Sequence, residues 1–306
     1  MRRIFFAAVL ITLSSIVASG HTSLITGNHQ NQQEFKLEKV AGNVHVLFGA
    51  GGNIGVSFGE DGLMTIDTQF ARFVPQIKAE LAKLGTDKPK FVFNTHFHGD
   101  HTGGNVLFGA DALIIAHDNV LERLMSKVDR QGNPQEPIAK AGRPMITYGK
   151  SISLHMNGER VKAVHFPNGH TDGDTVLFFT GSNVVHLGDD FFAGRFPFVD
   201  LNSGGSVPGL VKNIGSLLQM IPADAKLIPG HGPVSTIDDL RDYHSMLVET
   251  TLTVRKHMKN GKSLEDIKKA GLPEKYKSWS PENAFINEER WIETIYNSYE
   301  MKMKKE

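Results

Sequence analysis

Four potential metal ligands stand within six consecutive residues, in the segment HFHGDH at residues 96–101. The segment directly follows the apolar run FVF at residues 91–93, which is typical of a short buried strand. In an extended chain, residues two apart point to the same side, so His96 and His98 can bind one ion together. The residue types and their spacing therefore predict a metal site at the end of a strand.

The second half of this segment requires a bend in the chain. Asp100 and His101 are adjacent, so both can face one ion only if the backbone turns, and the preceding Gly99 permits such a turn. The spacing therefore indicates two neighbouring ions. A catalytic zinc keeps three protein ligands and an open position, so each ion still needs ligands from elsewhere in the chain.

Three further candidate ligands stand beside glycines, and these are His170, Asp189 and His231. They follow or end strand-like apolar runs at residues 161–166, 183–188 and 226–230. A glycine lets the backbone approach an ion closely, which favours ligation at such positions.

These candidates belong to four motifs that resemble those of the metallo-β-lactamase superfamily. The motifs are HxHxDH at residues 96–101, GHT at 169–171, LGD at 187–189 and PGHG at 229–232. They occur in the order typical of the family. The resemblance implies two Zn²⁺ per chain, with Asp189 bridging them. By the same resemblance His96, His98 and His170 would bind the first zinc, and Asp100, His101 and His231 the second.

Asp189 distinguishes branches of the superfamily. True class B β-lactamases usually have Cys or Ser at this position, whereas glyoxalase II and many lactonases have Asp. The chain contains no cysteine, so its ligand set is similar to that of glyoxalase II. The resemblance also implies that Asp67 is a buried acid beneath the HxHxDH segment, where it accepts a hydrogen bond from a ligating imidazole. Without the resemblance, Asp67 would be interpreted as a turn residue.

The expected function is a β-lactamase-like dinuclear zinc hydrolase, in which a metal-bound hydroxide attacks the carbonyl of a lactam, lactone, ester or thioester. The metal lowers the pKa of its bound water to about 7. Asp100 is expected to be catalytic, by positioning the nucleophile and returning its proton to the leaving group. Two alternatives stay open, an iron-dependent redox enzyme on the same fold and a non-catalytic metal-binding protein. His98 speaks against the di-iron branch, which usually has Glu there.

Substrate contacts are expected from the long connection that follows Asp189, because long ordered loops are commonly functional. Phe191, Phe192 and Phe196 would form an apolar wall beside the zinc ions, and Arg195 would bind a substrate carboxylate. The alternative is that these aromatic rings anchor the loop to the core while Arg195 faces solvent.

The composition agrees with an enzyme that acts on a small molecule. The formal net charge is zero, with 33 basic and 33 acidic residues, so nothing indicates nucleic acid or a membrane surface as a partner. The 306 residues are 40% hydrophobic, which is enough for a large core. The sequence leaves the oligomeric state open.

The first twenty residues are typical of a secretory signal peptide. Arg2 and Arg3 precede the apolar run 4–13, and small residues lead to Gly20. We expect cleavage of residues 1–20 to give a periplasmic or secreted protein without a stable membrane anchor. Residues 21–35 are polar and are interpreted as a flexible lead-in.

Residues 36–235 are predicted to form one α/β domain, the four-layer αββα sandwich of the family. Strand-like runs at 44–48, 54–58 and 63–66 indicate an antiparallel meander, and a second half repeats the scheme with a helix near 206–220. Asp118 is expected to cap a helix, and residues 129–149 to form a mobile surface loop. Residues 236–306 are predicted to be a helical extension packed on the sandwich, with Leu240, Tyr243, Met246, Leu247 and Leu252 on its apolar face. A structural role is favoured for it over a partner-binding surface.

Overall fold

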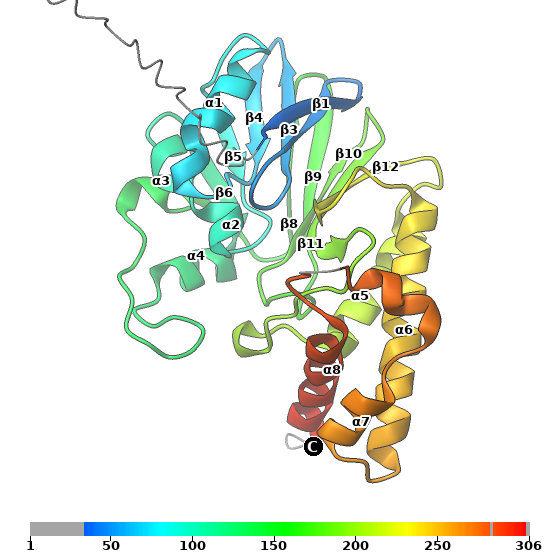
Figure 1. Cartoon of the computed structure of the whole chain (residues 1–306). Coiled ribbons are helices and arrows are strands. Elements are labelled where there is room, and N and C mark those ends of the chain that lie inside the picture. The colour runs from blue at the N-terminus through cyan, green and yellow to red at the C-terminus, as the bar shows by residue number, and fades with distance from the viewer. Residues whose placement is uncertain (1–33, 282–283, 304–306) are drawn as a thin grey trace, which may run out of the picture. The chain divides into compact units, whose positions relative to one another are not determined.

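The structure is a computed structural model, and it describes residues 34–281 and 284–303 of the chain (Figure 1). The predicted signal peptide and nearly all of the lead-in lie outside these residues. Among the described helices, none combines the length and the apolar character that a membrane-spanning segment needs.

Two β-sheets form the centre of the fold. The first has seven strands in chain order, and they are β1 (Lys36–Ala41), β2 (Val44–Phe48), β3 (Ile54–Gly59), β4 (Gly62–Ile66), β5 (Phe91–Phe93), β6 (Leu113–His117) and β7 (Ile146–Tyr148). The second has the order β12-β11-β10-β9-β8, from β8 (Ser151–Met156), β9 (Glu159–His165), β10 (Thr175–Phe179), β11 (Val184–Phe192) and β12 (Lys226–His231).

Each sheet combines antiparallel hairpins with parallel pairs. Strands β1 to β4 form the predicted antiparallel meander, and β4 to β7 run parallel. In the second sheet, β8 to β11 are antiparallel and β12 is parallel to β11. Asn157 and Gly158 connect β8 to β9 with positive φ angles of 56° and 72°. A two-residue turn of this kind suits an Asn-Gly pair and sets the register of the hairpin.

The main core lies between the two sheets. Val46 and Phe93 of the first sheet belong to the same buried cluster as Val161 and Leu177 of the second. Helix α1 (Val74–Ala82) and the short helices α2 (Gly99–Thr102) and α3 (Asn105–Phe108) lie beside the first sheet, and a separate cluster packs α1 and α3 on its outer face. Helix α5 (Val207–Met220) covers the outer face of the second sheet. The predicted αββα layering is therefore confirmed (Figure 1).

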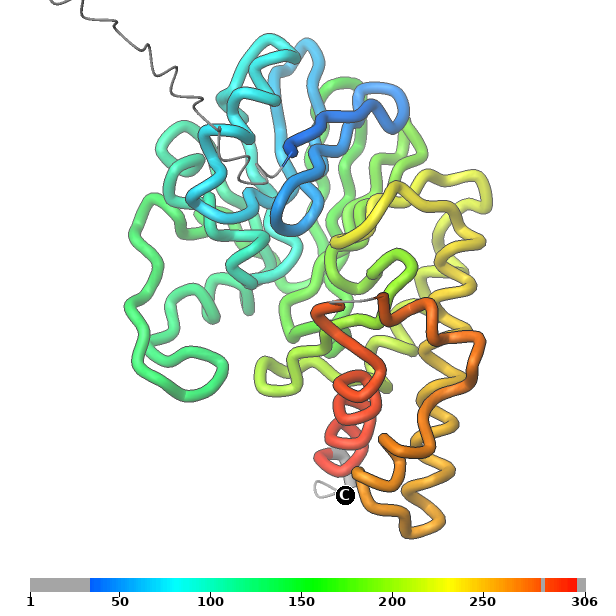
Figure 2. The backbone as a smooth tube through the Cα atoms, in the orientation of Figure 1, coloured from blue at the N-terminus to red at the C-terminus, as the bar shows by residue number. Residues whose placement is uncertain are grey.

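The C-terminal extension consists of α6 (Ile237–Lys259), α7 (Leu264–Ala270), the 3₁₀ helix η4 (Glu274–Trp279) and α8 (Glu288–Met303). Its apolar side chains share one buried cluster with α5 and the second sheet. Figure 2 shows the chain around residues 284–287, in orange to red, returning to the yellow-green connection that follows β11. The backbone N–H of Phe196 in that connection donates to the carbonyl of Trp279, 3.2 Å away. The extension therefore contacts the segment expected to line the site.

Several local predictions were wrong. Asp118 is the first residue of α4 (Asp118–Met125), and the cap is His117, whose side chain accepts a hydrogen bond from the N–H of Asn119. Leu252 is 57% exposed, because it lies off the buried face of α6. Residues 129–149 contain regular structure, namely η2 (Lys140–Gly142) and β7. The predicted strand at 183–188 continues as β11 to Phe192.

Candidate metal centre

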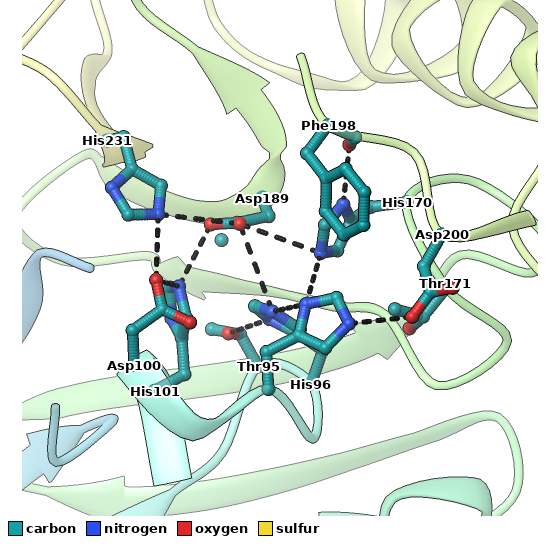
Figure 3. Close-up of polar contacts among 12 residues, drawn as sticks. Thr95, His96, Asp100, His101, His170, Thr171, Asp189, Phe198, Asp200 and His231 are labelled. Atoms are coloured by element: carbon teal, nitrogen blue, oxygen red, sulfur yellow. Dashed lines mark hydrogen bonds and ion pairs between the residues drawn. The ribbon is translucent and has the colours of Figure 1, made fainter. Parts of the chain in front are cut away.

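The seven predicted ligands come together in two adjacent groups, and Figure 3 shows Asp189 between His231 and His170. His96 and His98 follow β5, and Asp100 and His101 belong to α2. The other three come from the second sheet, with His170 between β9 and β10, Asp189 within β11 and His231 at the end of β12. Each sheet thus contributes a share of the site.

The chain turns at Gly99 by starting helix α2. Gly99 is not among the glycines with positive φ, and a Cβ atom built on it would meet nothing within 4 Å. The predicted turn is present, but its backbone is ordinary helix rather than a conformation that requires glycine. The helical turn brings Asp100 and His101 to the same side, which an extended chain could not do.

Three imidazoles of the first cluster point nitrogen atoms at one another. His96 Nε2 lies 3.1 Å from His98 Nδ1, which lies 2.9 Å from His170 Nε2. The carboxylate oxygen Asp189 Oδ2 lies 3.5 Å from His170 Nε2 and 3.9 Å from His96 Nε2. These four residues could hold one ion.

The second cluster consists of Asp100, His101 and His231. Asp100 Oδ2 lies 3.3 Å from His231 Nε2 and 3.7 Å from His101 Nε2. Asp189 lies between the clusters, with Oδ1 3.1 Å from His101 Nε2 and Oδ2 3.5 Å from His231 Nε2. The structure therefore places Asp189 where a bridging ligand would lie.

The donor atoms fit two small divalent ions. Ligand atoms on one tetrahedral zinc, with bonds of about 2.0 to 2.2 Å, lie roughly 3.3 Å apart, close to the distances within each cluster. In addition, His101 Nε2 and Asp189 Oδ1 are buried and face each other at 3.1 Å, but neither atom makes a hydrogen bond of normal geometry. Buried polar atoms without hydrogen bonds are rare and call for an explanation. A bound cation between the two clusters would provide one, and imidazole with carboxylate is a donor set that zinc prefers.

The ring nitrogens that face away from the centre are held by oxygen atoms. Nδ1 of His101 donates to Asp67 Oδ2 at 2.7 Å, and Nε2 of His98 donates to Asp200 Oδ2 at 2.9 Å. Nδ1 of His170 and Nδ1 of His96 meet the Phe198 carbonyl and the Thr95 hydroxyl, at 2.7 and 3.0 Å. Such outer hydrogen bonds are usual for metal-binding histidines, because they fix the tautomer and the ring orientation.

Asp67 lies beneath the HxHxDH segment, as the resemblance implied. It is fully buried, and besides His101 it binds Thr95 twice, through the backbone N–H at 2.8 Å and the hydroxyl at 2.7 Å. Its φ angle of 68° is unusual for a residue other than glycine. Such strained conformations cost of order 1–3 kcal/mol and are concentrated at functional sites.

The site depends on two glycines that leave room for the ligands. A Cβ on Gly230 would lie 2.0 Å from Asp189 Oδ1, and one on Gly52 would lie 2.1 Å from Cε1 of His101. β11 is irregular at this point, since its pairing with β12 shifts register on both sides of Gly188. A bulge re-aims side chains, and here it accompanies the placement of Asp189 at the centre.

The histidines of the centre differ in the direction in which their pKa values are shifted. Burial would lower the pKa of His231, but Asp189 and Asp100 raise it to about 9. Burial opposes the same shift at His101, whose pKa is raised by Asp189 and Asp100. Burial lowers the pKa of His170 to about 4. In the metal-free chain, protons therefore occupy His101 and His231 rather than His170.

The two carboxylates of the centre are held in the ionised form. Burial would raise the pKa of Asp100, yet His101 and His231 lower it to about 2. Against burial, His101 and His231 also hold the pKa of Asp189 well below its usual range. Asp100 has a 28% exposed side chain, whereas that of Asp189 is 5% exposed. Asp100 is therefore the more accessible of the two acids.

A cavity of about 930 Å³ opens above the ligands, and its lining includes His98, Asp100, Asp189 and His231. Phe192, Arg195 and Phe196 line it too, so these three predicted substrate contacts lie beside the centre. Phe191 does not, and that expectation is corrected. Because β11 continues to Phe192, neighbouring side chains point to opposite faces. Phe191 packs in the core, 5.1 Å from the ring of Tyr243, while Phe192 stacks on His231 at 5.2 Å.

Sequence reasoning missed Asp200 and the carbonyl of Phe198. Both lie in the connection after β11, where the sequence predicted functional roles only for the aromatic residues and Arg195. Asp200 Oδ2 also lies 3.7 Å from Arg130 Nη1, in the connection after α4. No spacing in the sequence predicts these contacts, because they form where the connections after β11 and α4 fold back onto the candidate ligands.

Comparison with known proteins identifies a matching family and related sequences. The family model described as the metallo-beta-lactamase superfamily matches residues 56–264. The hydroxyacylglutathione hydrolase of Nitrosococcus oceani is 28% identical over 144 residues, which cover 46% of this chain and 47% of that protein. The corresponding hydrolase of a Polaromonas species is 33% identical over 144 residues, with the same coverage. The chain thus spans about half the length of the curated relatives it matches.

Two solved structures show the same fold. A double mutant of the sec-alkyl sulfatase PisA1 has a TM-score of 0.66 at 15% identity, covering 87% of this chain and 50% of the sulfatase. The DIM-1 metallo-beta-lactamase has a TM-score of 0.56 at 18% identity, covering 70% of this chain and 97% of that protein. At these identities the likeness concerns the fold alone.

Proposed function

The chain belongs to the metallo-beta-lactamase superfamily, and on this premise we propose that it is an exported, dinuclear zinc-dependent hydrolase of carbonyl compounds. The observation that carries the proposal is the convergence of seven ligating groups in two adjacent clusters, with Asp189 between them. Four of the five imidazoles are held from outside by oxygen atoms. The names of the curated relatives are those of hydrolases, which supports a hydrolytic reaction.

Two zinc ions, when bound, supply Lewis-acid chemistry, because they lower the pKa of water to about 7 and polarise a carbonyl oxygen. His96, His98, His170 and Asp189 would hold one ion, and Asp100, His101 and His231 the other, with Asp189 shared between them.

The chain supplies proton transfer through Asp100. Its carboxylate lines the cavity, and a pKa of about 2 keeps it ionised at neutral pH. An ionised carboxylate there can orient the attacking water by accepting a hydrogen bond from it, and we propose that it relays the proton of that water to the leaving group. His101 is fully buried, and Asp67 holds its ring in place from behind through Nδ1.

The metal and the reaction are tested together on zinc-loaded protein. We expect two zinc ions per chain, with hydrolysis of at least one β-lactam, lactone, ester or glutathione thioester that stops when a chelator removes the metal. A protein that carries iron and absorbs visible light would favour the redox alternative. Failure to cleave any of the four classes with both zinc ions bound would favour a non-catalytic metal-binding protein.

We propose that Arg195 binds an anionic group of a small-molecule substrate, while Phe192 and Phe196 form part of the apolar wall. Arg195 is exposed, lines the cavity, and has no ion-pair partner among the described residues. Arg195→Ala should raise KM for carboxylated substrates about tenfold, as expected for a lost charged hydrogen bond, with kcat little changed. Arg241→Ala, on the exposed face of α6, is the control. An unchanged KM for every carboxylated substrate contradicts this role.

Export is proposed from the sequence of residues 1–20. The basic Arg2 and Arg3 followed by an apolar run support cleavage near Gly20 and a periplasmic or secreted location. N-terminal sequencing of the protein expressed from its full gene should find a chain that starts near residue 21 in the periplasmic or culture fraction. A cytoplasmic protein that retains Arg2 and Arg3 would contradict export.

A further inference from the structure

The cavity extends well beyond the metal ligands. Its volume of about 930 Å³ is at the upper end of the range of ligand pockets, roughly 300 to 1,000 Å³. Two segments outside the ligand motifs form its remote walls. One is the connection after α4, with Val128 and Ile138, and the other is the C-terminal extension, with Phe285 and Ile286. A large part of the cavity thus has no role in holding metal.

These remote walls expose apolar side chains to the cavity. Phe285 is 65% exposed and Val128 is 51% exposed, although large apolar side chains are usually covered. The ring of Phe285 is nevertheless held in place, edge-on to Phe198 at 5.8 Å and with the Arg290 guanidinium 4.8 Å from its centre. A fixed apolar surface that no described part of the chain covers is typical of a binding site.

Most of the charge at this end of the cavity is already paired. Arg123 binds Asp172, and Arg130 lies over the ring of Phe198 and 3.7 Å from Asp200. Asp129 accepts hydrogen bonds from Gln131 and Asn133 in its own loop. Because these charged groups already have partners, the apolar side chains are the part of the walls that is most available to a ligand.

We propose that Val128, Ile138, Phe198, Phe285 and Ile286 form a subsite for the hydrocarbon part of the substrate, next to the metal centre. This inference rests on the proposed hydrolase function and names its substrate class. The substrate is an ester, lactone or thioester with a medium-length alkyl or aryl acyl group, whose carbonyl lies at the metal ligands. The C-terminal extension, for which sequence reasoning favoured a purely structural role, contributes one wall of this subsite.

Hydrolysis of straight-chain p-nitrophenyl esters from acetate to decanoate tests the subsite. With zinc-loaded protein, kcat/KM should rise with chain length by up to about fourfold per methylene, the ratio that corresponds to 0.8 kcal/mol per buried CH₂. Phe285→Ala should reduce kcat/KM for the octanoate ester by about fivefold or more and that for the acetate ester by less than about twofold. Leu252→Ala is a matched control, because Leu252 is 57% exposed on α6 and does not line the cavity.

Binding provides a readout that does not depend on turnover. Calorimetry on the zinc-loaded chain should show that octanoate binds more tightly than acetate, with a more negative heat-capacity change. Phe285→Ala should weaken the binding of octanoate alone. The series shares one carboxylate, so the contribution of chain length is separated from any contact of the head group with zinc.

The outcomes separate the subsite from the proposed function. Binding of octanoate without hydrolysis of any ester would support the subsite and overturn the hydrolase. Hydrolysis with no dependence on chain length, or one that Phe285→Ala leaves unchanged, would overturn the subsite and keep the hydrolase. A dimer that forms with rising concentration and is lost in Phe285→Ala would assign the surface to a second copy of the chain, and would also overturn the subsite.

Discussion

The carboxylate of Asp200 holds one imidazole of the centre from outside, at 2.9 Å from Nε2 of His98. Because a negative acceptor fixes the ring and makes the imidazole a stronger donor to a metal, Asp200→Asn should lower zinc affinity by about tenfold, the lower end of the effect usual for such partners. The variant should keep its fold, since the amide has nearly the same shape. Competition with a coloured zinc chelator measures the affinity.

The control for this variant is Asp238→Asn, on an aspartate whose side chain is 82% exposed at the start of α6. It makes the same chemical change away from the centre, so its zinc affinity should equal that of the wild type. Equal affinity in Asp200→Asn as well would show that the hydrogen bond to His98 contributes nothing to metal binding.

Protonation of His231 sets the pH dependence of metal binding. Its pKa of about 9 in the metal-free chain means that it is protonated at pH 7, and only the neutral imidazole can bind a metal. The metal must therefore displace a proton from His231 and another from His101, whose pKa is also raised, so apparent zinc affinity should fall by at least roughly tenfold for each pH unit below 9. Calorimetric titration at pH 7 in buffers with different heats of ionisation should show at least one proton released per chain. Heats that do not vary with the buffer would contradict this.

The candidate ligands could be predicted because metal binding needs particular side chains at particular spacings. Asp200 and the carbonyl of Phe198 could not, since an acid in a loop and a backbone carbonyl look the same in sequence whether or not an imidazole lies beside them. His117 shows a similar limit, because its cap on α4 depends on a side-chain rotation that no spacing reveals.

At the scale of elements, β11 and β12 position the acidic ligand of the centre. Gly230 of β12 passes so close to Asp189 that an added Cβ would lie 2.0 Å from its Oδ1 atom. Gly230→Ala must therefore displace the carboxylate or the strand, at a cost of about 1–3 kcal/mol for overpacking. Because Asp189 lies between both clusters, we expect the zinc content of the purified variant to fall below two per chain. Metal analysis with a thermal unfolding curve checks both effects.

Gly99→Ala is the matched control for this substitution. Gly99 lies in the metal-binding segment, yet a Cβ there would meet nothing within 4 Å, and its φ angle is not positive. Its zinc content should therefore stay at two per chain. If Gly99→Ala lost as much zinc as Gly230→Ala, the effect of the Gly230 substitution could not be attributed to the contact between its Cβ atom and Asp189.

The alternation of apolar residues predicted most strands. The apolar runs before the candidate ligands predicted that these residues lie near the ends of strands. The sequence predicted a strand over residues 183–188, because the apolar run stops there. In the structure the strand continues through a bulge, which the parallel partner β12 supports from a distant part of the chain. The assignment of Phe191 to the cavity failed for this reason, since each side chain after the bulge depends on whether the strand continues.

At the scale of the whole molecule, the C-terminal extension and the sandwich share one core. Trp291 of α8 is fully buried, stacks on Phe196 at 6.1 Å, and donates from Nε1 to the Thr250 hydroxyl at 3.0 Å. The sequence predicted the helices of the extension but favoured a supporting role alone. Contact between Trp291 and Phe196 could not be foreseen, because it joins residues that are far apart in the chain.

This shared core predicts that the extension and the sandwich unfold together. Trp291→Ala removes a buried aromatic ring and leaves the Thr250 hydroxyl without its donor, so it should cost about 3–5 kcal/mol of unfolding free energy and lower the Tm by about 10 °C. The loss should appear in a single transition, because the cluster that contains Trp291 also contains Leu227 of β12 and Leu217 of α5. Scanning calorimetry of the zinc-loaded protein measures it, with the half-buried Trp279→Ala as a control that should lose less. Two separate transitions, of which only one moves, would mean that the extension folds independently and that its wall of the cavity is not fixed by the sandwich.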